Sequence, residues 1–152
     1  MTDFYHVCFA VPDLNAAMDD LTSAAGVQWS PPRADTLGGW SSRIVFSRTA
    51  PHIELIQGPA GSPWDTTGGA HFHHLGWWTH SLAGSAEQLT AAGLPQTFDG
   101  CPYGRSFAYH RVDSIGARIE IVDIAAQPAF LQTWNPGGEP MPALGDPEGP
   151  RP

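Results

Sequence analysis

Hydrophobic and polar positions alternate over residues 4–11, and most of these positions hold aromatic or β-branched residues. Such alternation predicts a strand. The apolar residues that follow recur instead with the spacing of one helical face: Leu14, Met18, Leu21 and Ala25. Asp13 stands where a helix N-cap is expected, and Gly26 stands where that helix would end. The chain is therefore predicted to begin with a strand and a helix.

Strands dominate the next stretch of the chain. Residues 40–48 and 52–57 are predicted as two strands joined by a turn near residues 49–51. Residues 27–39 contain Pro-Pro and Gly-Gly pairs, which favour a short strand and a loop. The strand and helix at the start are therefore followed by about three further strands.

The second half of the chain repeats this order of elements. Residues 72–79 are predicted as a strand, Ser81 as a helix cap and Gly93 as the end of that helix. The apolar face of the helix consists of Leu82, Ala86 and Leu89. Further strands are expected near residues 95–98, 106–112 and 116–123, followed by a short helix over 128–134.

The two halves also match residue by residue. Residues 4–11 align with residues 72–79 at an offset of 68, which places His6 on His74. The segment Ile-Glu-Leu-Ile around Glu54 returns as Ile-Glu-Ile-Val around Glu120, at an offset of 66. Similar segments in the same order at nearly one offset indicate a tandem repeat of a unit of about 65 residues.

These patterns predict one domain over residues 1–134, built from two modules at about 1–57 and 71–125. Residues 58–70 have the Gly- and Pro-rich composition of a linker. Residues 135–152 contain six Pro and four Gly and are predicted to be a C-terminal tail.

Charge and composition narrow the possible partners. The net charge of the 152-residue chain is −8, and its seven basic residues are all Arg. We therefore expect neither nucleic acid nor an anionic membrane as partner, because both require a basic face. A highly anionic substrate is also disfavoured, although one well-placed Arg could hold a carboxylate. The expected partner is a small molecule.

The remaining compositional features predict a cytoplasmic protein. Cys8 and Cys101 are too few for a disulfide framework or a Cys-type zinc site. The N-terminus lacks a basic leader, and no apolar run reaches membrane length. Abundant Ala, Gly and Pro with no Lys suggest a bacterial origin.

The duplicated His and Glu residues are the strongest indication of chemistry. A Glu between apolar residues of a strand is costly to bury unless it is paired or bound to a metal. Glu54 and Glu120 both occupy such positions, and His6 and His74 lie on the first strand of each module. One His or Glu alone is usually structural. Two of each at matching positions instead predict a site for a divalent metal ion.

This arrangement resembles the vicinal oxygen chelate superfamily, over roughly residues 4–123. That superfamily includes glyoxalase I, methylmalonyl-CoA epimerase, extradiol dioxygenases, fosfomycin-modifying enzymes and bleomycin-binding proteins. The resemblance implies an α+β fold in which tandem βαβββ modules form curled mixed sheets around an open cup. It also implies one divalent ion per cup, either Ni, Co, Zn, Mn or Fe. The implied ligands are His6, Glu54, His74 and Glu120.

In residue types this set is closest to bacterial glyoxalase I and to members like methylmalonyl-CoA epimerase. The resemblance implies a metal-dependent lyase or isomerase/epimerase that removes a proton next to a carbonyl and forms a metal-stabilised enolate. Glu120 is the implied base, with Glu54 as its counterpart on the opposite face. The expected substrate is small, oxygenated and fairly apolar, and family members lead us to expect a homodimer.

Two alternatives stay open. The same cup could hold Fe(II) in a ring-cleaving type of dioxygenase. It could also serve a protein without catalytic activity that binds an antibiotic or metabolite, as bleomycin-binding relatives do. The intact set of four ligands disfavours this second alternative, while the six Trp residues keep it under consideration.

Further residues are expected near the substrate. His52 and Arg118 each stand two residues before a Glu, so alternation along a strand directs them into the cup. Four aromatic residues are expected to line its pocket or wall: Trp78, Phe72, Tyr109 and Trp40. His73 is expected to face the helices and to bind no metal.

Overall fold

The computed structural model describes residues 4–141; the rest of the predicted tail, residues 142–152, lies outside the described residues. The elements of the first module are β1 (Phe4–Ala10), α1 (Leu14–Ala25), β2 (Arg33–Leu37), β3 (Trp40–Phe46) and β4 (His52–Gln57). Those that follow are β5 (His71–Thr79), α2 (Leu82–Ala91), β6 (Gln96–Asp99), β7 (Phe107–Val112), β8 (Ala117–Asp123) and α3 (Gln127–Trp134). The predicted elements are thus present in their predicted order.

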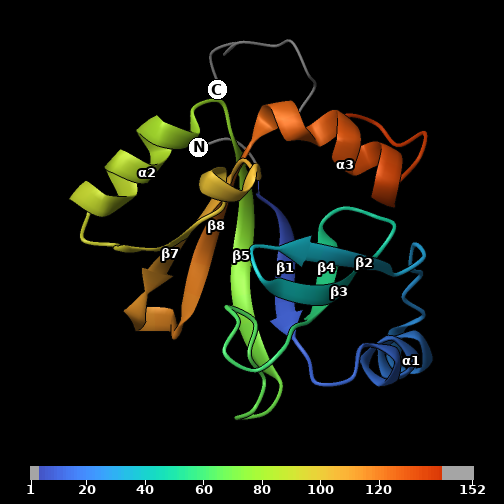
Figure 1. Ribbon diagram of the computed structural model, residues 1–152. Helices are drawn as coiled ribbons and strands as arrows, with labels where there is room; N and C mark the ends of the chain where they lie inside the picture. Colours follow the sequence, from blue (N-terminus) through green and yellow to red (C-terminus); the bar gives the residue numbers. More distant parts are fainter. Residues whose placement is uncertain (1–3, 142–152) are drawn as a thin grey trace.

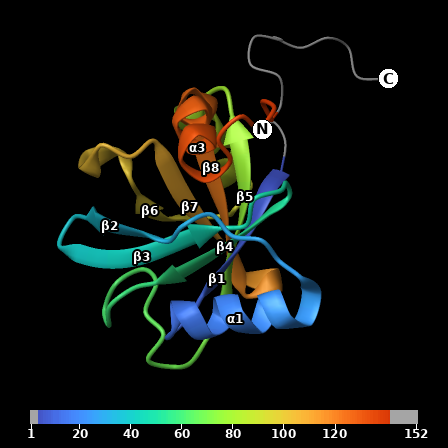
Figure 2. The same ribbon diagram turned by 90° about the vertical axis from the view of Figure 1, so that its right-hand side faces the viewer.

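All eight strands form one mixed sheet in the order β2-β3-β4-β1-β5-β8-β7-β6. The two modules meet at its centre, where β1 and β5 pair antiparallel. On either side, β4 pairs parallel with β1 and β8 pairs parallel with β5. The sheet curls around its concave face (Figures 1 and 2), which confirms the predicted α+β fold with an open cup.

The helices α1 and α2 cover the convex face of the sheet. Asp13 caps α1 by accepting from the backbone N–H of Ala16 at 3.0 Å, and Gly26 ends the helix with a left-handed φ of 67°. Buried Leu14 packs with Val45 and Leu55 of the sheet. Because side chains alternate along a strand, burying Leu55 under α1 directs Glu54 into the cup.

The second module places α2 in the same way. The Ser81 side chain accepts from the backbone N–H of Gly84, and Leu89 packs with Ala108 and Ile121. Burial of Ile121 on this side directs its neighbour Glu120 to the concave face. Each catalytic candidate is therefore oriented by an apolar neighbour that contacts a helix.

The helix α3 follows the second module but packs over the first. The ring of Phe130 lies 5.4 Å from Tyr5, 4.9 Å from Phe46 and 5.6 Å from Trp78. At the end of the helix, the hydroxyl of Ser30 donates to the carbonyl of Trp134. These contacts fix α3 across one side of the cup (Figure 1). None of the helices within residues 4–141 is long and apolar enough to cross a membrane.

The predicted linker contributes to the interior of the domain. Trp64 lies outside the helices and strands, yet only 4% of its surface is exposed. It packs in a cluster with Cys8, Ile56 and Tyr109. Its indole N–H donates to the Tyr109 hydroxyl at 3.0 Å. The segment between the modules therefore anchors a wall of the cup as well as connecting the strands.

We expect Trp64→Ala to lower the free energy of unfolding by about 3–5 kcal/mol, because it empties a well-packed site. Trp64→Phe should cost about 1–2 kcal/mol, since it keeps most of the packing and loses the hydrogen bond. Ile115, which is 51% exposed, supplies the control, and Ile115→Ala should change stability by no more than about 0.5 kcal/mol. Urea unfolding measures all three, and a Trp64→Ala variant as stable as the control would contradict this role.

Candidate metal centre

Strand register brings the four predicted ligands together from the four central strands. On β1 and β5, His6 lies opposite Gly76 and His74 lies opposite Cys8. The flanking strand β4 pairs Glu54 with Cys8, and β8 pairs Glu120 with Gly76. Each module therefore supplies one His from its first strand and one Glu from its last strand.

The side chains meet at one point, which we call the four-donor cluster: His6, Glu54, His74 and Glu120. The Nε2 atoms of the two His residues are 2.8 Å apart. His6 Nε2 lies 3.1 Å from an oxygen of each Glu, and His74 Nε2 lies 3.2 and 3.3 Å from the same two oxygens. Both His residues are completely buried, and the Glu residues are 7% and 9% exposed.

This geometry fits a divalent metal ion. Imidazole nitrogen and carboxylate oxygen bind transition metals at about 2.0–2.2 Å, so donors roughly 3 Å apart can surround one ion. Without a cation or shared protons, the lone pairs of these buried atoms would repel one another at the observed distances. Two imidazoles with two carboxylates suit Zn, Ni, Co, Fe or Mn. The cluster could therefore hold one such ion.

The electrostatics of the cluster also favour a positive charge between the four donor atoms. Burial favours neutral carboxyl groups, yet hydrogen bonds and charge from His6 and His74 hold the pKa values of Glu54 and Glu120 below the ordinary value. Burial likewise opposes charge on His6, but its hydrogen bonds to both Glu residues raise the pKa of the imidazole. The carboxylates thus stay ionised and attract a proton or a metal ion to the nitrogens.

A buried chain of hydrogen bonds orients His74. The Nε2 atom of His73 lies 2.8 Å from the carbonyl oxygen of Pro63, and its Nδ1 atom lies 2.8 Å from Nδ1 of His74. A carbonyl can only accept, so His73 Nε2 carries the proton and its Nδ1 accepts from His74. Burial lowers the pKa of His73 to about 3, which keeps it neutral. This chain leaves the Nε2 lone pair of His74 directed at the cluster.

The position of His73 corrects our expectation that it faces the helices. The β1–β5 pairing is irregular between the pairs Cys8–His74 and Phe9–Phe72. This irregularity breaks simple alternation, so His73 and His74 both lie on the concave side. Phe72, expected in the pocket, instead packs its ring 5.6 Å from that of Phe9, which is 38% exposed on the other side.

His6, the other His of the cluster, is held by close packing. An added Cβ at Gly76 would lie 2.0–2.7 Å from three ring atoms of His6. Only Gly leaves room there for the imidazole. The ring of Tyr5 closes another side at 4.3 Å. His6 and His74 are therefore oriented by different means, although their strands are equivalent.

The other predicted pocket residues lie in the walls around the cluster. Trp78 is fully buried and stacks on Tyr5 at 4.0 Å. Tyr109 is 3% exposed, and its ring lies 5.0 Å from that of His74. Tyr109 therefore packs directly against the cluster, and Trp78 packs against it through Tyr5.

Three further residues expected at the pocket line neither of the cavities at the cluster, which are described below. The His52 ring is buried 5.3 Å from Phe130. Trp40 packs on Phe98 at 6.1 Å. Arg118 lies opposite His74 and Arg111 in the sheet. His52 thus lies beside His6, its partner in the sheet, and packs against Phe130 of α3.

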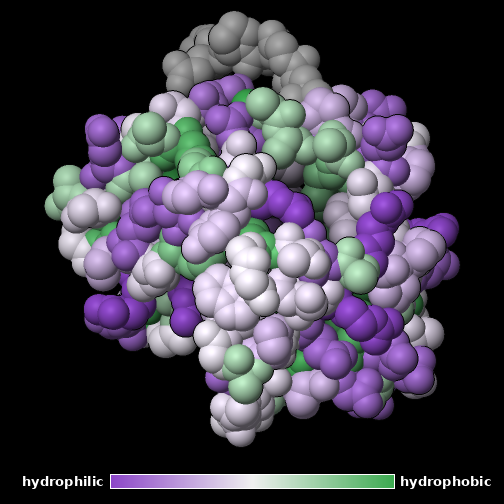
Figure 3. Space-filling view, viewed as in Figure 1, coloured by the Kyte–Doolittle hydropathy of each residue, from purple (hydrophilic) through white to green (hydrophobic). Residues whose placement is uncertain are grey.

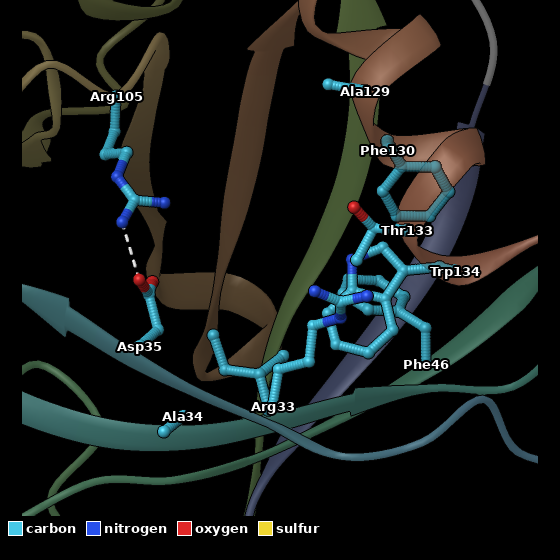
Figure 4. Close-up of a pocket in the computed structure, with 10 residues that line it drawn as sticks. Arg33, Ala34, Asp35, Phe46, Arg105, Ala129, Phe130, Thr133 and Trp134 are labelled. Carbon is cyan, nitrogen blue, oxygen red and sulfur yellow. Dashed lines mark hydrogen bonds and ion pairs between the residues drawn. The ribbon is translucent and has the colours of Figure 1, made fainter.

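Two neighbouring cavities connect the cluster with the surface. An inner cavity of about 280 Å³ is lined by both Glu residues of the cluster together with Tyr5, Phe46, Arg105 and Phe107, among others. An outer cavity of about 360 Å³ shares Phe46 and Arg105 with it and adds Arg33, Asp35, Phe130 and Trp134 (Figure 4). Seen from the side of Figure 1, the surface near α3 mixes apolar and strongly hydrophilic residues (Figure 3).

Apart from Glu54 and Glu120, sequence reasoning missed the residues that line these cavities. Phe46 and Ile44 do alternate on a predicted strand, which is a usable signal. Arg33 begins β2, in the stretch of residues 27–39 where a short strand and a loop are predicted without bounds for either. The residues of α3 reach the cup through a packing arrangement that no local pattern encodes. The walls of the mouth thus depend on tertiary contacts.

Comparison with known proteins identifies relatives of the fold. The sequence model of the glyoxalase/bleomycin resistance protein/dioxygenase superfamily matches residues 5–111. No curated protein sequence shows a significant match to the chain.

Several solved structures share the fold at low identity. A variant of the Streptomyces coelicolor methylmalonyl-CoA epimerase in complex with 2-nitronate-propionyl-CoA is 16% identical, with a TM-score of 0.62 over 81% of this chain and 97% of that one. The Mycobacterium tuberculosis methylmalonyl-CoA epimerase is 17% identical, with a TM-score of 0.57 over 79% and 86% of the two chains. A mutant of 4-hydroxymandelate synthase from Streptomyces coelicolor is 15% identical, with a TM-score of 0.58 over 79% and 47%.

Replacing His73 tests the buried chain of hydrogen bonds. We expect His73→Phe to weaken divalent-metal binding by the cluster about 10- to 100-fold, because His74 loses the acceptor that fixes its tautomer. His73→Gln should retain most of the affinity, since an amide can donate to Pro63 and accept from His74. Calorimetric titration with Zn²⁺ or Ni²⁺ gives the affinities. His80→Phe, at an exposed position, is the control. Equal affinities for His73→Phe and wild type would show that the chain has no such role.

Proposed function

Because the chain belongs to the glyoxalase/bleomycin resistance protein/dioxygenase superfamily, known also as the vicinal oxygen chelate group, we propose that it is a metal-dependent lyase or isomerase/epimerase. Its substrate would be a small oxygenated molecule that loses a proton next to a carbonyl. The observation that carries this proposal is the convergence of two imidazoles and two carboxylates at the base of an accessible cavity. The neighbours named above support the fold and leave the substrate open.

We assign the four-donor cluster as the ligand set of one divalent ion: His6, Glu54, His74 and Glu120. A bound ion would act as a Lewis acid that polarises a substrate carbonyl and acidifies the neighbouring C–H bond. The protein contributes a buried, preorganised environment in which that polarisation is strong. Tyr5 and Phe107 line the cavity beside the two carboxylates and limit the access of water.

Proton transfer is assigned to the carboxylates, with Glu120 as the base. Glu54 and Glu120 both line the inner cavity, and they reach it from strands on opposite flanks of the β1–β5 pair. A substrate held between them could lose a proton from one face to Glu120, which would leave a planar enolate. Glu120 could return that proton in an isomerisation, whereas an epimerisation would require Glu54 to take up a proton from solvent and donate it to the opposite face. The depressed pKa values of both groups keep them ionised at neutral pH, which is the protonation state that a general base requires.

Two histidines with one carboxylate are also the ligand set of non-haem Fe(II) oxygenases, which makes a dioxygenase the second candidate. The fourth ligand disfavours it, because such enzymes need open positions on the iron. A binding protein without catalysis is disfavoured by the complete ligand set. The expected homodimer and cytoplasmic location stay predictions.

Metal binding provides the first test. Elemental mass spectrometry on untagged protein should find about one transition-metal ion per chain, because the chain contains one such set of four donors among its described residues. Removing one ligand with Glu120→Gln should weaken metal binding by more than about 100-fold, beyond the usual cost of losing a residue that only hydrogen-bonds to a ligand. The exposed Glu87 supplies a matched control, since Glu87→Gln makes the same chemical change on α2. Wild-type protein that binds no divalent metal on titration would exclude the proposed chemistry.

Proton exchange provides a test of the reaction class. Metal-loaded protein in D₂O should catalyse deuterium uptake next to a carbonyl in at least one member of a panel of 2-hydroxyketones, hemithioacetals and acyl thioesters, read by proton NMR. Glu120→Gln should slow that exchange by about 10²- to 10⁴-fold, which is the usual contribution of a general base. Oxygen consumption without exchange would favour the dioxygenase instead, and tight binding with neither activity would favour a binding protein.

A further inference from the structure

The outer cavity is lined by charged and aromatic side chains that the proposed proton transfer does not use. It measures about 360 Å³ and adjoins the inner cavity at Phe46 and Arg105, which line both. Phe46 is the strand neighbour of Glu54, and its ring lies 5.5 Å from that of His6. A ligand bound at the four-donor cluster therefore reaches the outer cavity by passing over Phe46.

The two Arg residues of this cavity differ in their partners. Arg105 binds Asp35, with 2.5 Å between Nη2 and Oδ1, so its charge is compensated (Figure 4). Arg33 has no acidic partner within ion-pair distance among residues 4–141. A divalent ion would balance Glu54 and Glu120, which leaves Arg33 as the uncompensated charge along this path.

Aromatic packing places Arg33 at the mouth of the cavity. Its guanidinium carbon lies 5.9 Å from the ring centroid of Trp134, a cation–π arrangement that restricts the side chain without using its hydrogen-bond donors. Trp134 is itself fixed, because its ring lies 5.1 Å from that of Phe46 and its carbonyl accepts from Ser30. The guanidinium therefore keeps its planar fork of donors available for a carboxylate.

Apart from Thr133 and the Arg105–Asp35 pair, the rest of the wall consists of apolar and aromatic side chains. Ile44, Phe46, Ala129 and Phe130 line the cavity on the side of Arg33. Such a surface suits a flat hydrocarbon or aromatic segment. One free cation on a chain with a net charge of −8 selects a single anionic group and disfavours a polyanion.

We propose that Arg33 binds a carboxylate of the substrate, so that the substrate is a monocarboxylate with an apolar or aromatic body. Its oxygenated end lies at the four-donor cluster and its body crosses Phe46. This inference rests on the proposed function for the position of the reacting end. The carboxylate site itself depends only on Arg33 and the outer cavity.

Aryl hydroxamates supply suitable probes, because the hydroxamate offers two vicinal oxygens to a metal while the other end of the ring is varied. We would titrate Zn²⁺-loaded protein with benzohydroxamates that carry a 4-carboxy, 4-carboxymethyl or 4-(2-carboxyethyl) group. Each has a matched carboxamide that removes only the charge. Wild type should bind at least one carboxylate about tenfold more tightly than its carboxamide, as expected for one charge-assisted pair.

Arg33→Gln should abolish this preference and leave carboxamide binding unchanged. The control variant Arg111→Gln changes an exposed Arg that pairs with Asp113 on another part of the sheet, and it should behave as wild type. Equal binding of carboxylate and carboxamide throughout the series, an undiminished preference in Arg33→Gln, or no binding by any member at millimolar concentration would each overturn the inference.

A second arm separates this inference from the proposed function. Treatment with a chelator should weaken the binding of the carboxylate and of its matched carboxamide equally, and it should preserve the preference for the carboxylate. If chelation leaves both affinities unchanged, the metal-dependent function fails while the carboxylate site stands. If chelation weakens both but Arg33→Gln has no effect, the function stands and the carboxylate site fails.

Discussion

The structure depends on one constraint: four electron-pair donors lie close together in a buried space. The two imidazole nitrogens lie 2.8 Å from each other and 3.1–3.3 Å from an oxygen of each carboxylate, distances at which the lone pairs require a shared cation or protons. Such a cluster forms only if rigid elements position every donor. The eight-stranded sheet provides this rigidity, because each donor lies within a paired strand. The neighbours of the two Glu residues, Leu55 and Ile121, also pack on the convex side.

Duplication explains how a small domain builds this centre. One module supplies a His and a Glu, and the antiparallel pairing of β1 with β5 brings the second pair from the opposite side. The symmetry ends at the residues that support the donors. His74 is oriented through His73 and Pro63, whereas His6 is confined by Tyr5 and by the missing side chain of Gly76. The two imidazoles therefore differ in how firmly hydrogen bonds fix them.

The mouth of the cup is even less symmetric. Only one side is covered by α3, and the single uncompensated Arg of the path lies there against Trp134. Substrate selection can therefore change through α3 and the β2–β3 hairpin without disturbing the cluster. The solved structures that share the fold have 15–17% identity to this chain, which is compatible with a common scaffold whose walls have diverged.

The sequence alone determined the order of the elements, the duplication and the four residues that meet at the cluster. Periodicity and repetition are local properties of a chain, and Glu54 and Glu120 are conspicuous because burying a charge is costly. Tertiary structure decided the rest. The irregular β1–β5 pairing turned His73 into the cup and Phe72 out of it, and no one-strand pattern contains that information. Trp64, Phe130 and Arg33 reached the site through contacts between distant segments, which depend on how the whole chain packs.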